Sequence, residues 1–154
     1  MKAGSRQRGF TYLSLLLIIA AMGFGMAAFG QLASQQAMRE KEAELLFIGD
    51  AYRQAIAQYY QSGPGGHKRY PETLEQLLKD ERFSFHRRHL RKLYRDPVTG
   101  GNFEVVKAPE GGIMGVFSAS GAPPVKSANF PPEYASFEAA QRLNEWQFLY
   151  VPPT

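Results

Sequence analysis

The stretch FTYLSLLLIIAAMGFGMAAFGQLASQQAM, residues 10–38, decides the expected fold because it contains no Asp, Glu, Lys, Arg or His. Elsewhere charges are frequent, and charged residues make up 21% of the whole chain. As a helix rising about 1.5 Å per residue, the stretch would measure about 44 Å, which exceeds a hydrocarbon core of about 30 Å. The pattern therefore predicts a transmembrane and stalk helix over residues 10–38, whose last turns emerge from the lipid.

The residues before this stretch set its expected orientation. Lys2, Arg6 and Arg8 are basic, and no acidic residue occurs before Glu40. By the positive-inside rule, residues 1–9 stay in the cytoplasm and the C-terminal part crosses the membrane. Without these three cations, little remains of the formal charge of +4, which argues against bulk binding of a polyanion.

Length and composition limit the function classes. With 154 residues, one small globular domain can follow the helix, and a large multidomain enzyme is excluded. The chain has no cysteine, which excludes disulfides, thiolate zinc sites and cysteine nucleophiles. The stability of the domain must therefore come from packing.

Two plainer interpretations of the apolar stretch stay open. A secretory signal would need a small-residue cleavage site, which Ala27, Ala28, Gly30 or Ala33 could supply. However, the stretch runs without a turn into an amphipathic helical pattern, which an excised signal does not require. The other interpretation is a signal anchor with no further processing.

The N-terminal residues resemble a known processing motif. A short basic leader is followed by the string RGFTYL, residues 8–13, which opens the apolar helix. This arrangement resembles the prepilin-type cleavage and methylation motif of type IV pilins and type II secretion pseudopilins. The resemblance implies that a prepilin peptidase cuts between Gly9 and Phe10, removes residues 1–9 as a leader peptide, and methylates the new amine of Phe10.

One position departs from the family pattern. The family usually carries a glutamate where this chain has Ser14, and that carboxylate is thought to pair with the N-terminal amine of a neighbouring subunit. A serine hydroxyl cannot supply the charge, although it can donate a hydrogen bond to a backbone carbonyl of the preceding turn. Because family members that lack the glutamate tend to be minor subunits, the resemblance implies a minor subunit or a paralogue with a different assembly partner.

From Arg39 onward the helical pattern becomes one-sided. Apolar residues recur at steps of three and four, as expected for one buried helix face: Leu45, Ile48, Tyr52, Ala55, Ile56 and Tyr59. We therefore expect one helix from about Phe10 to Gln61, with residues 39–62 as the amphipathic continuation of the stalk. The sequence GPGG at residues 63–66 is expected to end it.

Residues 63–154 are expected to form a periplasmic globular domain. The patterns predict a short helix over residues 71–80, a hairpin with strands near 103–105 and 113–117, a helix over 133–145 and a final strand over 146–150. The expected fold class is α+β and pilin-like: a long N-terminal helix, transmembrane in its first half and amphipathic in its second, packed on a small antiparallel β-sheet.

This layout also resembles the general secretion pathway protein G branch of the pseudopilins. Tyr70 and Pro71 precede the short helix, and Arg95, Asp96 and Pro97 precede the hairpin. The resemblance covers about residues 1–120. The chain lacks the C-terminal cysteine pair of many type IV pilins and the aspartate cluster of the branch's calcium loop, so no calcium site is expected.

No catalytic or metal site is expected. His86 and His89 are spaced so that one helix face could carry both imidazoles, but Arg87 and Arg88 between them oppose a divalent cation. Ser118 lacks the Gly-x-Ser-x-Gly context of a hydrolase nucleophile, and no phosphate-binding glycine motif occurs. We expect a non-enzymatic protein with no cofactor and no metal, whose histidines are surface residues.

The stretch 82–95 combines cations with aromatic residues. Its cations are Arg82, Arg87, Arg88, Arg91, Lys92 and Arg95. On a helix over residues 84–93, Arg87 and Arg91 would share one face, and Arg88 and Lys92 another, so these four are the candidate partner contacts. The stretch can equally be a solvated face balanced by the acidic residues 80, 81 and 96. Other interpretations are contact with an acidic partner subunit, with anionic lipid or with DNA.

Together, these patterns and the resemblance predict a structural subunit, minor rather than major, of a type II secretion pseudopilus or a related type IV filament. Expected partners are other pilin or pseudopilin subunits, the prepilin peptidase and an inner-membrane assembly platform, whereas nucleic acid is not expected. The expected location is the bacterial inner membrane, single-pass, with the globular domain in the periplasm and the assembled filament periplasmic or extracellular.

Two alternatives come from other functional classes. The first is a minor type IV pilin that acts as an adhesive or DNA-capturing module through residues 82–95. The second is a membrane-anchored periplasmic enzyme, which would need a polar cleft with paired catalytic groups, and the residue spacings assemble none.

Overall fold

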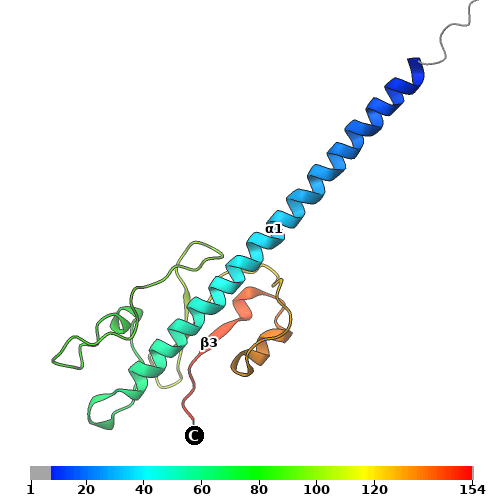
Figure 1. The fold of residues 1–154 in the computed structure, drawn as a ribbon. Coiled ribbons are helices and arrows are strands. Elements are labelled where there is room, and N and C mark those ends of the chain that lie inside the picture. The colour runs from blue at the N-terminus through cyan, green and yellow to red at the C-terminus, as the bar shows by residue number, and fades with distance from the viewer. Residues whose placement is uncertain (1–7, 154) are drawn as a thin grey trace, which may run out of the picture. The chain divides into compact units, whose positions relative to one another are not determined.

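The computed structural model describes the backbone of residues 8–153 and the side chains of residues 11–22 and 34–153 (Figure 1). The chain divides into two compact units, Met1–Ala37 and Met38–Thr154, each of which is described by itself. One helix, α1 (Arg8–Gln61, 54 residues), contributes to both. The remaining elements belong to the second unit: η1 (Pro64–Gly66), η2 (Leu74–Leu77), β1 (Glu104–Lys107), β2 (Ile113–Phe117), η3 (Pro132–Ala139), η4 (Leu143–Glu145) and β3 (Gln147–Leu149).

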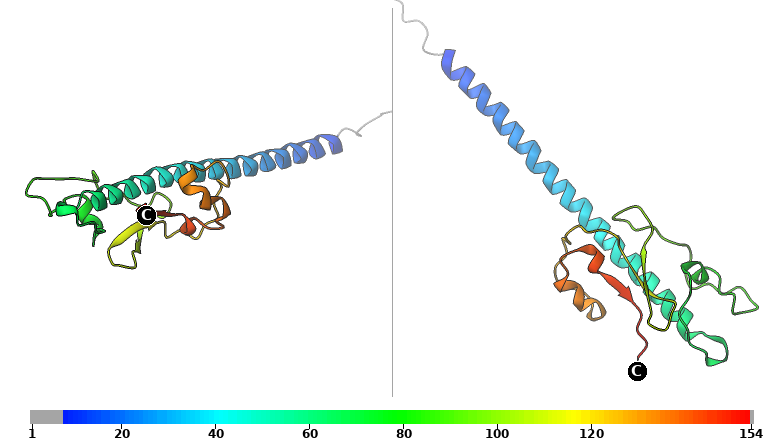
Figure 2. Two further views of the ribbon diagram at one scale, coloured as in Figure 1. Left: turned by 90° about the horizontal axis from the view of Figure 1, so that it is seen from below. Right: turned by 180° about the vertical axis from the view of Figure 1, so that it is seen from behind.

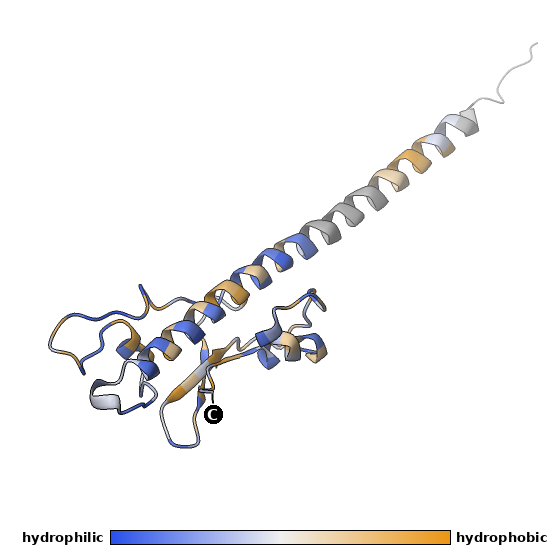
Figure 3. Cartoon of the chain, turned by 60° about the horizontal axis from the view of Figure 1, so that its bottom comes forward, coloured by the Kyte–Doolittle hydropathy of each residue, from blue (hydrophilic) through white to orange (hydrophobic). Residues whose placement is uncertain are grey.

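In the first unit, the structure differs from the predicted transmembrane helix. The described side chains of this unit, from Thr11 to Met22, are mostly apolar. Where side chains are described again, from Ser34, the helix is largely polar (Figure 3). Within the described residues, no helix is both long and apolar enough to cross a membrane. For the described residues, this finding contradicts the predicted transmembrane half over residues 10–38. The fold is α+β with a three-stranded antiparallel sheet.

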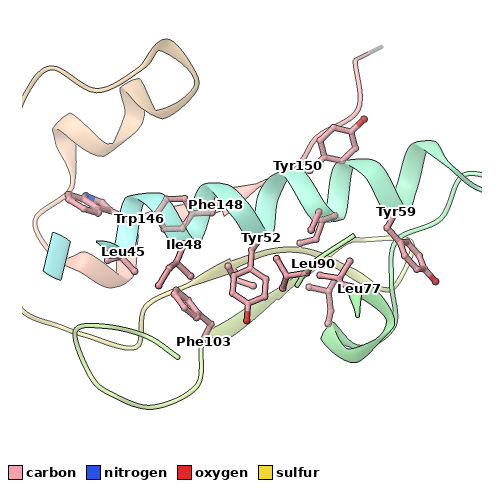
Figure 4. Close-up of a cluster of buried hydrophobic side chains, with 14 of the residues drawn as sticks. Leu45, Ile48, Tyr52, Tyr59, Leu77, Leu90, Phe103, Trp146, Phe148 and Tyr150 are labelled. Atoms are coloured by element: carbon pink, nitrogen blue, oxygen red, sulfur yellow. The ribbon is translucent and has the colours of Figure 1, made fainter. Parts of the chain in front are cut away.

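The second unit is organised around the C-terminal half of α1 (Figure 2). The apolar face of this half is buried, as predicted. Six side chains of this face are at most 4% exposed: Leu45, Ile48, Tyr52, Ala55, Ile56 and Tyr59. Figure 4 shows how residues of this face meet aromatic side chains such as Phe103 and Phe148. The predicted end at Gln61 is confirmed, and the helix begins at Arg8 rather than Phe10. Beyond it, Gly65 and Gly66 have φ of 67° and 80°, a conformation that favours glycine.

The three strands form an antiparallel sheet in the order β1-β2-β3. The central strand pairs Val116 with Val105 on one side and with Phe148 on the other. A register shift between Val106 and Lys107 interrupts the first pairing. The predicted hairpin and the predicted final strand are thus confirmed, although β3 is shorter than expected.

The predicted helices of the globular part are wrong in type or extent. The segment 71–80 contains only the 3-10 helix η2, and the segment 133–145 contains the two 3-10 helices η3 and η4. In η3 the backbone of Tyr134 leaves helical values, at φ −119° and ψ 19°, and Ala140 is extended. Tyr134 and Phe137 are buried against Trp146 and Phe148, so aromatic packing rather than helical periodicity determines this segment.

Two close approaches hold the parts of the second unit together. A Cβ atom on Gly49 of α1 would overlap the ring of Phe148, so the absence of a side chain brings β3 against the helix. Glu42, which is only 1% exposed, accepts hydrogen bonds from the backbone N–H groups of Val125 and Lys126 at 2.6 and 2.9 Å. This carboxylate ties the proline-rich segment after β2 to α1.

Candidate functional site

The N-terminal turns of α1 form an apolar surface, which we call the apolar helix surface. Its large side chains are 46–67% exposed: Tyr12, Leu13, Leu15, Leu16, Leu17, Ile18, Ile19 and Met22. Consecutive helical residues are rotated by about 100°, so an unbroken run from Leu15 to Ile19 covers every side of the helix. A partner for this surface must therefore surround the helix rather than hold one face of it.

The predicted processing residues lie at the start of the same helix. Gly9 and Phe10 are helical in backbone, and their side chains lie outside the described residues. Ser14 is half-buried within α1 and takes part in an interaction of its own. Cleavage between Gly9 and Phe10, methylation of Phe10 and the substitution at Ser14 therefore stay predictions.

The basic stretch is a loop and not the predicted helix. None of the described elements lies between Leu77 and Glu104, so a helix over residues 84–93 is wrong. The chain closes on itself instead: the N–H of Asp80 donates to the carbonyl of Arg87 at 3.0 Å, and the N–H groups of His89 and Leu90 donate to the carbonyl of Leu77. These backbone groups therefore pair across the loop instead of with the next turn of a helix.

The side chain of Asp80 explains why the loop closes. It is fully buried and accepts a hydrogen bond from Arg82 Nε at 2.8 Å and another from Arg82 Nη2 at 2.7 Å. His89 Nε2 lies 3.0 Å from the second carboxylate oxygen. Burial by itself raises the pKa of Asp80, but the hydrogen bonds from Arg82 and His89 outweigh it and lower the pKa to about 2. The carboxylate therefore stays charged at neutral pH.

This cluster also fixes the loop to α1. Arg82 Nη2 donates to the backbone carbonyl of Tyr59 at 2.7 Å, and the guanidinium carbon lies 3.5 Å from the centroid of the Tyr59 ring. The interpretation of Asp80 as a surface counter-charge is wrong, because its side chain is 0% exposed. The interpretation of His89 as a surface histidine is also wrong, because the His89 side chain is 2% exposed. Asp96 was expected to have the same surface role, yet it too is buried and accepts hydrogen bonds from Thr99 and Ser118.

The four candidate partner contacts do not form two helical faces. Arg88, Arg91 and Lys92 are exposed, whereas Arg87 is half-buried with its guanidinium 4.8 Å from the Phe83 ring centroid. Lys92 lies over the ring of Tyr94 at 5.1 Å. The structure therefore presents these cations together with aromatic rings, on a loop whose base is held by Asp80.

The described residues offer no metal site. Among them, no group of three or more His, Cys, Asp or Glu side chains is placed to hold an ion. His86 is exposed while His89 is buried against Asp80, so the two histidines of the i, i+3 pair do not share a face. The Ser118 hydroxyl donates to the buried Asp96 at 2.7 Å, which is a structural hydrogen bond.

No model of a known protein family, no curated protein and no solved structure matches this chain.

Proposed function

We propose that this chain is a structural, non-enzymatic subunit of a type II secretion pseudopilus or a related type IV filament. The observation that carries the proposal is the apolar helix surface between Tyr12 and Met22. Exposed apolar patches of this kind mark interaction sites, because apolar area left in water costs about 25 cal/mol per Å². In a filament, helices of neighbouring subunits would cover this surface from every side.

The sequence motif at the start of α1 is a second, independent argument for the same proposal. RGFTYL at residues 8–13 resembles the prepilin processing motif, and it directly precedes most of the apolar helix surface. Processing between Gly9 and Phe10 would place the new terminus within one turn of Leu13. Since Ser14 replaces the family's glutamate, we propose a minor subunit within the assembly.

Partners and location are parts of this proposal. The partners are other pilin-like subunits, a prepilin peptidase and an assembly platform at the bacterial inner membrane. The second unit is compact by itself, with its own core, so it can present surfaces to neighbours while α1 assembles.

Intact-mass and peptide mass spectrometry of the protein isolated from cells that contain a prepilin peptidase tests the proposal. We expect a chain that begins with N-methylated Phe10, and a Gly9→Val variant that keeps its leader. Filaments sheared from the cells should contain this chain at low stoichiometry. An intact Met1 with the peptidase present, or a start near Gln31, would overturn the proposal.

A further inference from the structure

Residues 81–89 form a loop, the Phe85 loop, whose base is fixed from three directions. Arg82 and His89 both contact the buried carboxylate of Asp80, at 2.7 and 3.0 Å, and the backbone of Asp80 bonds to Arg87. A loop held in this way loses little conformational freedom on binding, so its exposed side chains are pre-organised for a partner.

The tip of this loop carries an unusual exposed group. Phe85 is 61% exposed, and its ring lies 5.3 Å from that of Phe83, which Arg87 covers. Arg88, three residues further along the loop, is exposed and forms no ion pair with an acidic side chain of the described chain. Aromatic and arginine side chains are the groups that most often dominate binding energy at interfaces. The complementary surface is an apolar hollow with acidic residues at its rim.

The same chain carries such a hollow. A groove of about 320 Å³ lies between η2 and the β1–β2 hairpin, and apolar residues make up much of its lining: Leu74, Leu93, Phe103, Val105 and Ile113. Glu72 and Glu75 are exposed at this groove, and neither forms an ion pair within the described chain. The groove thus offers apolar area and negative charge where the Phe85 loop offers an aromatic ring and positive charge.

We propose that Phe85 of one copy inserts into this groove of a second copy, with Arg87 and Arg88 facing Glu72 and Glu75. Donor and acceptor are different surfaces, so each copy can use both at once, and the contact is head-to-tail. This inference deepens the proposed function, on which it rests, by naming a contact between neighbouring globular units. A minor subunit can form this contact where two or more of its copies are adjacent in the filament.

Cysteine cross-linking tests the contact cleanly, because the chain has no cysteine of its own. Full-length Ser84→Cys and Thr73→Cys chains, each with a different tag, are mixed and oxidised. Ser84 adjoins Phe85 and Thr73 lines the groove, so the substitutions leave the proposed contact intact. We expect a disulfide-linked pair carrying both tags, reduced at least about tenfold when Phe85→Ala is added to the Ser84→Cys chain.

A matched control uses Ser127→Cys, which lies at a different groove, in place of Ser84→Cys. Charge exchange provides a second test: Arg88→Glu or Glu75→Arg alone weakens cross-linking, and mixing the two restores it. Equal cross-linking with Ser127→Cys, or no cross-link at all, overturns the inference. DNA binding is the alternative outcome. If no cross-link forms, and the Phe85→Ala or Arg88→Glu chain retains less of a DNA oligonucleotide than the original chain, the inference is also overturned.

The N-terminus of the same samples separates the two proposals. Methylated Phe10 without the cross-link between positions 84 and 73 leaves the proposed function standing and removes the contact. A cross-link between positions 84 and 73 in a chain that keeps Met1 leaves the contact standing and removes the proposed function.

Discussion

Asp80 is the residue that joins most of the contacts at the base of the Phe85 loop. Its carboxylate is 0% exposed and receives hydrogen bonds from Arg82 and His89, while Arg82 in turn reaches the carbonyl of Tyr59 in α1. Buried charges of this kind are tolerated because each has a close partner. Removing one of them leaves the other without compensation.

We expect Asp80→Asn to lower the free energy of unfolding by about 3 kcal/mol at pH 7, because the Arg82 side chain, 9% exposed, would lose its counter-charge. The effect should depend on pH. The pKa of Asp80 lies near 2 in the folded chain, against 3.8 without the fold, so its stabilisation is complete above about pH 4 and is lost as pH falls toward 2. Urea unfolding of both chains between pH 7 and pH 2 measures this.

The comparison isolates Asp80 because other carboxylates titrate in both proteins. One of them is Asp50. Burial raises the pKa of Asp50, but hydrogen bonds from Tyr134 and Arg53 lower it by more, and this effect is the same in both proteins. The difference between the two unfolding free energies should therefore shrink at low pH. A difference that stays constant with pH would show that the Asp80→Asn substitution acts through packing and not through charge.

The buried polar residues differ in how far the sequence reveals them. Glu42 precedes Leu45 and Ile48 by helical steps that place it on the buried face, but its charge favoured the polar face, so its burial was not predicted. Asp80 and His89 carry no such signal. They meet because the chain turns back between them, and that turn depends on the Asp80 carboxylate itself.

At the level of elements, the long helix and the strands were predictable, whereas the short helical patterns were not. The amphipathic half of α1 and the hairpin have repeated local signals, and both were found. The segments 71–80 and 133–145 have apolar residues at helical spacing, yet their aromatic and leucine side chains pack against α1 and the sheet in 3-10 or irregular backbone. Tertiary packing overrides weak helical preference in segments of this length.

Gly49 tests the packing of α1 against β3. Alanine is favoured over glycine inside a helix by about 1 kcal/mol, but its Cβ would overlap the Phe148 ring. Overpacking typically costs about 1–3 kcal/mol, so we expect Gly49→Ala to lower the free energy of unfolding by about 1 kcal/mol net. Thermal and urea unfolding measure the change.

Two further variants give this prediction its controls. Gly121→Ala, at a position with no neighbour within 4 Å, should leave stability nearly unchanged. Phe148→Leu in the Gly49→Ala background makes room for the new Cβ, so the Gly49→Ala penalty should be smaller there than in the original chain. A stabilised Gly49→Ala chain would mean that the helix and strand can move apart without loss.

For the molecule as a whole, the sequence revealed the apolar character of the N-terminal turns of α1 but not the environment of these turns. The prediction placed the uncharged stretch in a membrane, whereas eight of its large apolar side chains are exposed in the described chain. The inference that this stretch crosses a membrane needed a continuous apolar length, which the described residues do not provide. The Phe85 loop and its complementary groove were beyond prediction, because each is formed by residues from several segments.

Substitutions on the apolar helix surface separate assembly from folding. Leu15 and Ile19 are four residues apart on one helix face, 54% and 57% exposed, and belong to the first compact unit. If neighbouring helices bury both, Leu15→Gln with Ile19→Gln should weaken assembly by about 3 kcal/mol, or roughly a hundredfold. Recovery of tagged chain in sheared filaments measures it.

The same double variant should leave the second unit intact, because that unit has its own core between Leu45 and Tyr150. Its thermal unfolding is expected to match that of the original chain, and Lys41→Gln, exposed on α1 but polar, should change neither unfolding nor filament recovery. Undiminished filament recovery from the double variant would mean that these side chains are not buried by neighbours. The apolar helix surface would then have to meet a different partner, since its exposure in water is unfavourable in any isolated copy.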